Sequence, residues 1–202
     1  MNYKYITGKV LEIDKSSGWT DGMLLEEIYP ESSFVSGNNP ESMMMKPFIK
    51  DRKVYTKYSF EKRFEGGPGL VHGGILSAAL DDMMGYSTII HNKFAVTAKL
   101  EVNFLIPTPV LKEFEILAWV KKIDGKKIYT ESLIKSDEQI HVESSAMFID
   151  LGLDAAEFFA DKPKGAQPSI ALMSNITEYA DQLVKQEYSS TQIHLKLEEL
   201  PQ

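Results

Sequence analysis

The residues best suited to chemistry lie in the middle of the chain, between residues 72 and 82. His72, Gly73 and Gly74 follow one another directly, and Asp81 and Asp82 lie further along the same apolar stretch. A helix that begins at Gly73 leaves several backbone N–H groups unpaired, and its dipole makes that end electropositive. Donors placed in this way can stabilise the oxygen of a carbonyl that becomes negative during acyl transfer. The stretch therefore predicts a site that binds and activates a carbonyl group.

The spacing between His72 and Asp81 predicts that this site needs two chains. Nine residues of α-helix rise about 13.5 Å and turn through about 900°, which leaves Asp81 roughly half a turn out of phase with His72. One helix therefore cannot readily aim its N-terminal donors and Asp81 at the same atom. Two antiparallel copies can, because Gly73 of one chain would then face Asp81 of the other. We expect a homodimer with two equivalent sites.

Asp81 and Asp82 are adjacent, and spacing alone does not decide which of them acts. A carboxylate inside an apolar helix is costly to bury unless it is hydrogen-bonded or has a function. We therefore expect one of the two side chains to be exposed. Burial of the other would raise its pKa and make it a better base near neutral pH.

The hydrophobic pattern predicts the elements that must position these residues. A broad apolar surface over residues 73–90 is typical of a helix that is covered by a sheet. Alternating residues predict strands over 53–63, 94–106, 112–122, 126–136 and 139–150. The third and fourth strands are joined by Asp124-Gly125, a strong hairpin signal. One helix followed by an antiparallel run indicates an α+β fold.

Two finer expectations concern local structure. Strict alternation along residues 94–106 places Thr97 and Lys99 on one face of the strand and Leu100 on the other. Pro40 suits the first turn of a short helix that would run through Met45, in a cluster of methionines that is more typical of adaptable core than of a functional surface.

Val71-His72-Gly73-Gly74 with Asp81 nine residues after the histidine resembles the hotdog-fold acyl-CoA thioesterases of the PaaI and thioesterase-superfamily type. The strand Thr97-x-x-Leu100-x-Val102-x-Phe104 and the Asp124-Gly125 hairpin strengthen the match, which covers roughly residues 50–150. The resemblance implies a hotdog fold, in which a curved antiparallel sheet wraps one long central helix. It also implies assembly as a homodimer or as a homotetramer made from two dimers.

The resemblance further implies roles for single residues. Asp81 matches the family's catalytic carboxylate, which acts as a general base on water or as a nucleophile on the thioester. Gly73 matches the residue whose backbone N–H polarises the thioester carbonyl, and Thr97 matches a hydroxyl residue that assists the attacking water in some members. Some relatives place an Asn or Gln side chain several residues before the histidine. This chain has Glu65-Gly66-Gly67-Pro68 there, so the source of a second carbonyl donor stays open.

The remaining candidate site residues have competing interpretations. His72 is either a general base or a residue that shapes the turn, and we favour the structural role because a helix N-terminus disfavours its charged form. Gly74 is expected to contribute to substrate binding beside it. The lysines around the hairpin turn form either a solvated tip or a site for the phosphates of coenzyme A: Lys121, Lys122, Lys126 and Lys127.

Composition narrows the class of protein. The 202 residues carry a formal net charge of −7, which argues against a non-specific nucleic-acid binder. No cysteine is present, and the histidines show no metal-ligand spacing, so we predict no metal. We expect no transmembrane helix and no signal peptide, and hence a cytoplasmic protein. The predicted layout is an N-terminal extension over residues 1–50 that packs on the domain, a hotdog domain over 51–152 and a helical extension over 153–202.

The leading functional hypothesis is hydrolysis of an acyl-CoA to the free acid and CoA. No cofactor is expected, because coenzyme A is part of the substrate. Two alternatives use the same fold. One is a non-catalytic acyl-CoA binder, which would not need Asp81 and Thr97. The other is an acyl-thioester dehydratase or hydratase, in which His72 and Asp81 would act together.

Overall fold

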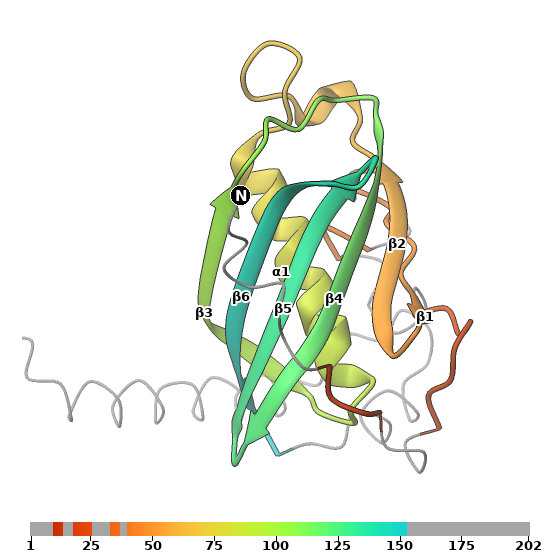
Figure 1. The fold of residues 1–202 in the computed structure, drawn as a ribbon, viewed down its shortest axis with the longest axis vertical. Helices are drawn as coiled ribbons and strands as arrows, with labels where there is room; N and C mark the ends of the chain where they lie inside the picture. The colour runs from red at the N-terminus through yellow and green to blue at the C-terminus, as the bar shows by residue number, and fades with distance from the viewer. Residues whose placement is uncertain (1–9, 14–17, 26–32, 37–39, 153–202) are drawn as a thin grey trace, which may run out of the picture. The chain divides into compact units, whose positions relative to one another are not determined.

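One long helix lies against one face of a six-stranded antiparallel sheet (Figure 1). The computed structural model describes residues 10–13, 18–25, 33–36 and 40–152, so the predicted C-terminal extension over 153–202 lies outside the described residues. The helix is α1 (Gly73–Ile89), and a short 3₁₀ turn, Lys62–Phe64, precedes it. The strands are β1 (Phe48–Lys50), β2 (Lys53–Ser59), β3 (Ala95–Phe104), β4 (Glu113–Asp124), β5 (Lys127–Ser136) and β6 (Gln139–Asp150).

The order of strands across the sheet is β1-β2-β4-β5-β6-β3. The helix therefore carries the chain across the sheet, from β2 near one edge to β3 at the other (Figure 1). β3 pairs with β6 on one side only, so its second edge has no partner among the described strands. The predicted α+β class is confirmed, and the predicted strand and helix positions hold to within a few residues. β1 is an additional strand that the sequence pattern does not indicate.

The core lies between α1 and the sheet. The buried helical residues facing it are apolar: Leu76, Ala79, Leu80, Met83 and Met84. They pack in one cluster with strand residues that include Ile116, Ile128, Ile134 and Val142. Burial of a side chain of this size stabilises the fold by roughly 1.5–3 kcal/mol. This packing holds α1 in one position. The positions of the helix residues that do not face the core are therefore fixed as well.

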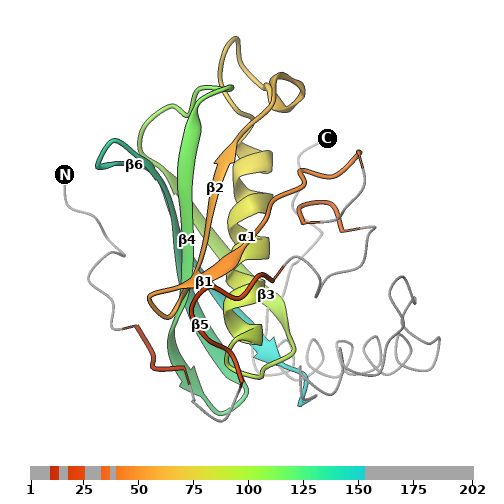
Figure 2. The same cartoon turned by 90° about the vertical axis from the view of Figure 1, so that its right-hand side faces the viewer.

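The stretch before β1, here residues 33–36 and 40–47, lies on the side of α1 that faces away from the sheet (Figure 2). Met43 and Met45 from this stretch are buried in the same core cluster as α1. The predicted helix through Met45 is wrong, because residues 43–47 have no helical structure and Met44 has a φ of 53°. Alternate methionines point into the core here, which is a strand-like arrangement that a helix could not provide.

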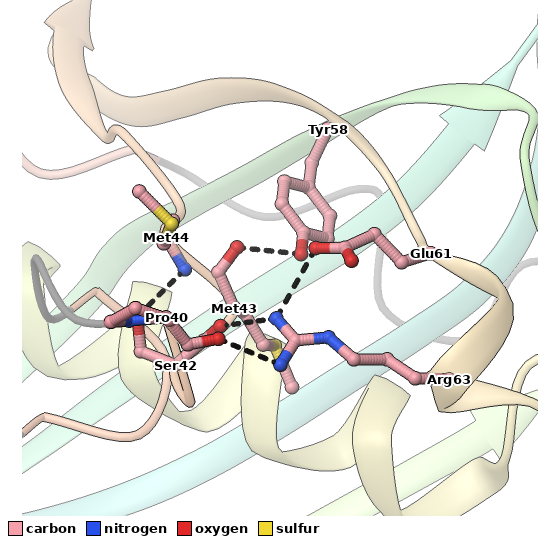
Figure 3. Close-up of polar contacts among 7 residues, drawn as sticks. All are labelled: Pro40, Ser42, Met43, Met44, Tyr58, Glu61 and Arg63. Atoms are coloured by element: carbon pink, nitrogen blue, oxygen red, sulfur yellow. Dashed lines mark hydrogen bonds and ion pairs between the residues drawn. The ribbon is translucent and has the colours of Figure 1, made fainter.

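Two side chains of the domain hold this stretch by its backbone carbonyls (Figure 3). The Arg63 guanidinium donates to the carbonyl oxygens of Pro40, at 2.9 Å, and Ser42, at 2.6 Å. The Tyr58 hydroxyl donates to the carbonyl oxygen of Met43 at 2.6 Å. Carbonyl groups outside regular structure need such donors when water is excluded. The stretch is therefore fastened to β2 and to the 3₁₀ turn.

A β-bulge corrects the predicted alternation along β3. Thr97 pairs with Phe148 of β6, and Lys99 pairs with the adjacent Met147, so one residue of β3 has no counterpart. An extra residue of this kind reverses which face the following side chains occupy. Thr97 consequently shares the helix-facing side of the sheet with Leu100, instead of lying opposite to it.

Candidate active site

The first turn of α1 begins in a loop that presents one unpaired backbone donor. His72 is the N-cap residue: its Nδ1 accepts the Gly74 N–H at 2.9 Å, and its carbonyl oxygen accepts from Ile75 and Leu76. The Gly73 N–H has no acceptor among the described residues. Because the dipole of α1 adds positive potential at this point, the Gly73 N–H is suited to bind a carbonyl or carboxylate oxygen.

Glycines make this geometry possible by leaving room around His72. A β-carbon on Gly66 would lie 2.9 Å from the His72 Cα, and one on Gly74 would lie 3.0 Å from the His72 Nδ1. The first of these contacts is with backbone, which cannot move aside without opening the loop. The His72 backbone N–H is also fixed, because it donates to the Phe64 carbonyl oxygen at 2.9 Å. Glycines are thus required at these positions because the backbone there lies so close to His72.

Asp81 lies two turns further along α1 and meets Thr97 of the edge strand. The Thr97 hydroxyl donates to the Asp81 Oδ1 at 2.9 Å. Asp81 is partly buried and Thr97 is exposed, so the pair lies at the rim of the domain. Burial raises the pKa of Asp81, and the hydrogen bond from Thr97 partly offsets that increase. The pair can hold a water molecule and accept a proton from it.

The neighbouring Asp82 points to a different partner. The Ser36 hydroxyl donates to the Asp82 Oδ2 at 2.7 Å. The pKa of Asp82 is raised to about 6, mainly by burial, while the Ser36 hydrogen bond opposes the increase and the charge of Asp81 adds to it. The expectation that one of the two aspartates is exposed is wrong, since both are partly buried. The stretch before β1 covers Asp82, which a helical pattern alone could not indicate.

The structure brings Asp81 and Thr97 together but does not bring either of them to Gly73 of the same chain. Asp81 follows Gly73 by eight residues on one straight helix, which corresponds to a separation of about 12 Å along the axis. A single carbonyl group cannot contact both at hydrogen-bonding distance. One chain therefore contains the two halves of a site that could polarise a carbonyl and activate water, at two different places.

Comparison with known proteins shows which family this part of the chain resembles. Residues 68–142 match the family model described as Thioesterase superfamily, which spans the glycine loop, α1 and strands β3 to β5. Over these residues the chain is similar to the thioesterase superfamily. It is 35% identical over 103 residues to the acyl-coenzyme A thioesterase THEM4 of Xenopus laevis, a match that covers 50% of this chain and 46% of that protein. The chain thus spans about half the length of the curated relatives that it matches.

Solved structures establish the fold of this chain. A thioesterase superfamily protein superposes with a TM-score of 0.53 at 26% identity, over 55% of this chain and 55% of that one. The E. coli PaaI protein from the phenylacetic acid degradation operon superposes with a TM-score of 0.52 at 14% identity, over 55% of this chain and 83% of that one. The predicted hotdog fold is confirmed.

The lysines that were predicted to bind coenzyme A lie around the β4–β5 turn, far from Gly73. The β4–β5 turn is at the opposite end of the sheet from the first turn of α1 (Figure 1). Lys121 donates to the buried Glu131 at 2.5 Å, and Lys122 donates to Asp124 at 2.6 Å. The turn is closer in register to Thr97, because Thr97 and Ile128 both pair with Phe148. Gly74 was also predicted to bind substrate, but its N–H already donates to His72.

Two residues near the site were not identified from the sequence. Ser36 lies 46 positions before its partner Asp82, in a stretch with turn chemistry, so no local pattern links the two. Phe104 entered the sequence analysis only as part of a strand motif, yet it is 54% exposed and lies against Gly73. In the described part of the chain, no group of three or more His, Cys, Asp or Glu side chains could hold a metal ion. No helix among the described residues is long and apolar enough to cross a membrane.

Proposed function

We propose that this protein hydrolyses acyl-CoA thioesters at two equivalent sites, each formed by two copies of the chain. The observation that carries the proposal is the separation of the free Gly73 N–H from the Asp81–Thr97 pair on one helix. The superfamily match and the curated acyl-coenzyme A thioesterase relative support a thioester as the substrate. The homodimer supplies what one chain lacks.

The open edge of β3 supports this mode of assembly. A ten-residue strand with one unpaired edge is a ready template for pairing with another strand. Antiparallel pairing of two β3 strands about a two-fold axis near Leu100 would place Thr97 of one chain opposite the Phe104 end of the other. Because Phe104 lies against Gly73 in its own chain, the same pairing would bring Asp81 toward the Gly73 of the partner. The arrangement is isologous, as a closed dimer requires.

In this site the Gly73 N–H holds the thioester carbonyl oxygen, which becomes negative when the carbonyl carbon is attacked. Asp81 accepts a proton from water, and the water oxygen forms the new bond to the carbonyl carbon. Thr97 donates to Asp81 and offers its oxygen lone pairs to the same water. The C–S bond then breaks, and the proton held by Asp81 passes to the sulfur. The products are a carboxylic acid and the CoA thiol.

In this proposal the lysines of the β4–β5 turn bind the phosphates of CoA. They lie at the end of the sheet that Thr97 occupies, so CoA extending away from Asp81 would reach them. Lys121 and Lys122 are each paired with a carboxylate of the same chain, and binding of a phosphate would compete with those pairs. Lys126 and Lys127 flank the same turn. A lysine ammonium is an effective point charge for phosphate.

Release of thiol from a panel of short, medium, long and aromatic acyl-CoAs tests the activity directly. We expect free acid and CoA in equal amounts, and slower release from acyl-pantetheine, which lacks the phosphates. Tight acyl-CoA binding without any thiol release would contradict hydrolysis and would favour a binding protein. A change in unsaturation without thiol release would favour a dehydratase. Single-turnover hydrolysis in ¹⁸O-labelled water identifies direct attack by Asp81, since that route leaves label in the carboxylate of Asp81.

A further inference from the structure

Two opposite charges lie near the centre of β3, the strand whose second edge has no partner among the described strands (Figure 1). From Lys99 to Phe104 this strand pairs regularly with β6. Leu100 packs against the core, so Lys99 and Glu101, on either side of it, point to the opposite face of the sheet. Their side chains are 71% and 39% exposed, and Lys99 Nζ lies 4.0 Å from Glu101 Oε2. The proposed dimer places both charges beside the partner chain.

Symmetry restricts the ways in which two β3 strands can pair. The proposed site needs both helices on the same side of the joined sheet, which requires a two-fold axis perpendicular to that sheet. In an antiparallel pair such an axis passes between two directly opposed residues, so one residue of β3 must face its own copy. Moving the axis to the next residue shifts the partner by two residues, or about 7 Å along the strand. A shift of that size would separate Asp81 from the partner's Gly73.

The two charges distinguish these registers. With Leu100 opposite its own copy, Lys99 of each chain lies opposite Glu101 of the other, which gives two equivalent pairs. If the axis moves one residue in either direction, two Lys99 ammonium groups or two Glu101 carboxylates meet instead. Opposite charges that face each other across a strand pair stabilise it, and like charges destabilise it. Both neighbouring registers are therefore disfavoured relative to the one centred on Leu100.

Resting on the proposed two-chain thioesterase site, we infer that Lys99 and Glu101 form the surface by which β3 recognises the same strand of a second copy, in the register centred on Leu100. An open strand edge can otherwise pair with many strands, and charges along it restrict that choice. Exposed charges of this kind contribute more to register and partner choice than to affinity. Lys99 and Glu101 are positioning residues: they bring Asp81 of one chain to Gly73 of the other.

The register is tested with single cysteines, because the chain contains none of its own. Tagged K99C and untagged E101C are refolded together and oxidised. They should form a mixed disulfide, since opposed Cα atoms lie about 4.5–5.5 Å apart, and this heterodimer keeps one Lys99–Glu101 pair. Each variant alone should cross-link poorly, because its cysteines are offset by two residues and lie more than about 7 Å apart. Absence of the mixed disulfide, or efficient cross-linking of either variant alone, would overturn the inference.

The role of charge is tested by reversing it. K99E makes both positions acidic and E101K makes both basic, so each variant alone should dimerise about tenfold more weakly at low salt, measured by analytical ultracentrifugation. A mixture of the two should dimerise as wild type does, because every opposed pair again has opposite charges, and so should the double variant K99E/E101K. K57E is the matched control, because Lys57 is an exposed strand lysine that pairs with Glu113, away from β3. Equal dimerisation of wild type, K99E and E101K would contradict the inference.

Thiol release measured on the same samples separates this inference from the proposed function. K99E and E101K should each lose activity at concentrations where they are monomeric, and their mixture should recover it. If the disulfides and the charge effects appear but wild type releases no thiol, the proposed function fails and the recognition surface stands. If wild type releases thiol while neither charge reversal changes dimerisation, the function stands and the recognition surface is wrong.

Discussion

The donor at Gly73 and the carboxylate at Asp81 lie on the same helix but depend on different parts of the chain. The Gly73 N–H is set by contacts within residues 64–74, where His72 caps the helix and Gly66 leaves room for it. Asp81 is set by contacts between distant segments, since Thr97 reaches it from the edge strand. One half of the site is local backbone geometry, and the other half is tertiary structure.

This difference has consequences for how each half can fail. A backbone donor survives most side-chain substitutions and is lost only when the N–H itself is removed. A carboxylate at the rim depends on its own chemistry, on the hydrogen bond that it receives and on its burial. Substitutions that separate these requirements therefore test the comparison.

The largest loss is expected at Asp81. D81N keeps the shape of the side chain but removes the basic oxygen, and kcat/KM should fall by about 10³-fold. D82N is the matched control, because it makes the same change one residue away on the carboxylate that faces Ser36. Its loss should stay below tenfold. A larger loss in D82N than in D81N would show that Asp82, and not Asp81, is the catalytic carboxylate.

The next largest loss is expected when the Gly73 donor is removed. Gly73 is the first helical residue, where proline is well tolerated, and His72 has the extended conformation that a following proline requires. G73P should lower kcat by about 10²-fold, the usual cost of one oxyanion donor, with little loss of stability. G73A adds a similar contact with Phe104 but keeps the N–H. Equal losses in G73P and G73A would show that crowding, and not the donor, is responsible.

A smaller effect is expected at Thr97. T97V removes the hydrogen bond to Asp81, and kcat/KM should fall by about tenfold. That bond lowers the pKa of Asp81, so its loss should raise this pKa further. Activity needs the ionised carboxylate, so the acid limb of the pH–rate profile should move to higher pH in T97V and stay in place in T97S. An unchanged acid limb in T97V would separate Thr97 from the proton transfer.

The smallest effect is expected at His72. H72A removes the cap on the Gly74 N–H and should cost about 1 kcal/mol in the free energy of unfolding, measured with urea. H72N keeps a side-chain acceptor and should recover most of that loss. Both variants should retain activity to within about tenfold, since the imidazole transfers no proton in this account. A loss of 10²-fold or more in stable H72N would instead make His72 a general base.

The sequence predicts the local half of the site better than the tertiary half. The glycine loop, the start of α1 and the turn at Asp124-Gly125 follow from residue types at short range, and the structure contains them where expected. Residue types at short range do not predict the face that Thr97 occupies. The bulge after Thr97 reverses the alternation, and that bulge depends on pairing with β6. The Ser36–Asp82 contact and the extended path of Met43–Met45 depend on packing between segments far apart in sequence. No local pattern contains that information.

The central claim is that Gly73 of one chain and Asp81 of another serve the same substrate, and mixing two inactive variants tests it most directly. G73P and D81N are unfolded together, refolded as a mixture and assayed for thiol release beside each variant refolded alone. A hybrid dimer would contain one site with both groups intact, so random pairing should restore about a quarter of wild-type activity. If each site belongs to one chain, every site in the mixture keeps a defect. The mixture would then stay as inactive as its components, and the shared site would be wrong.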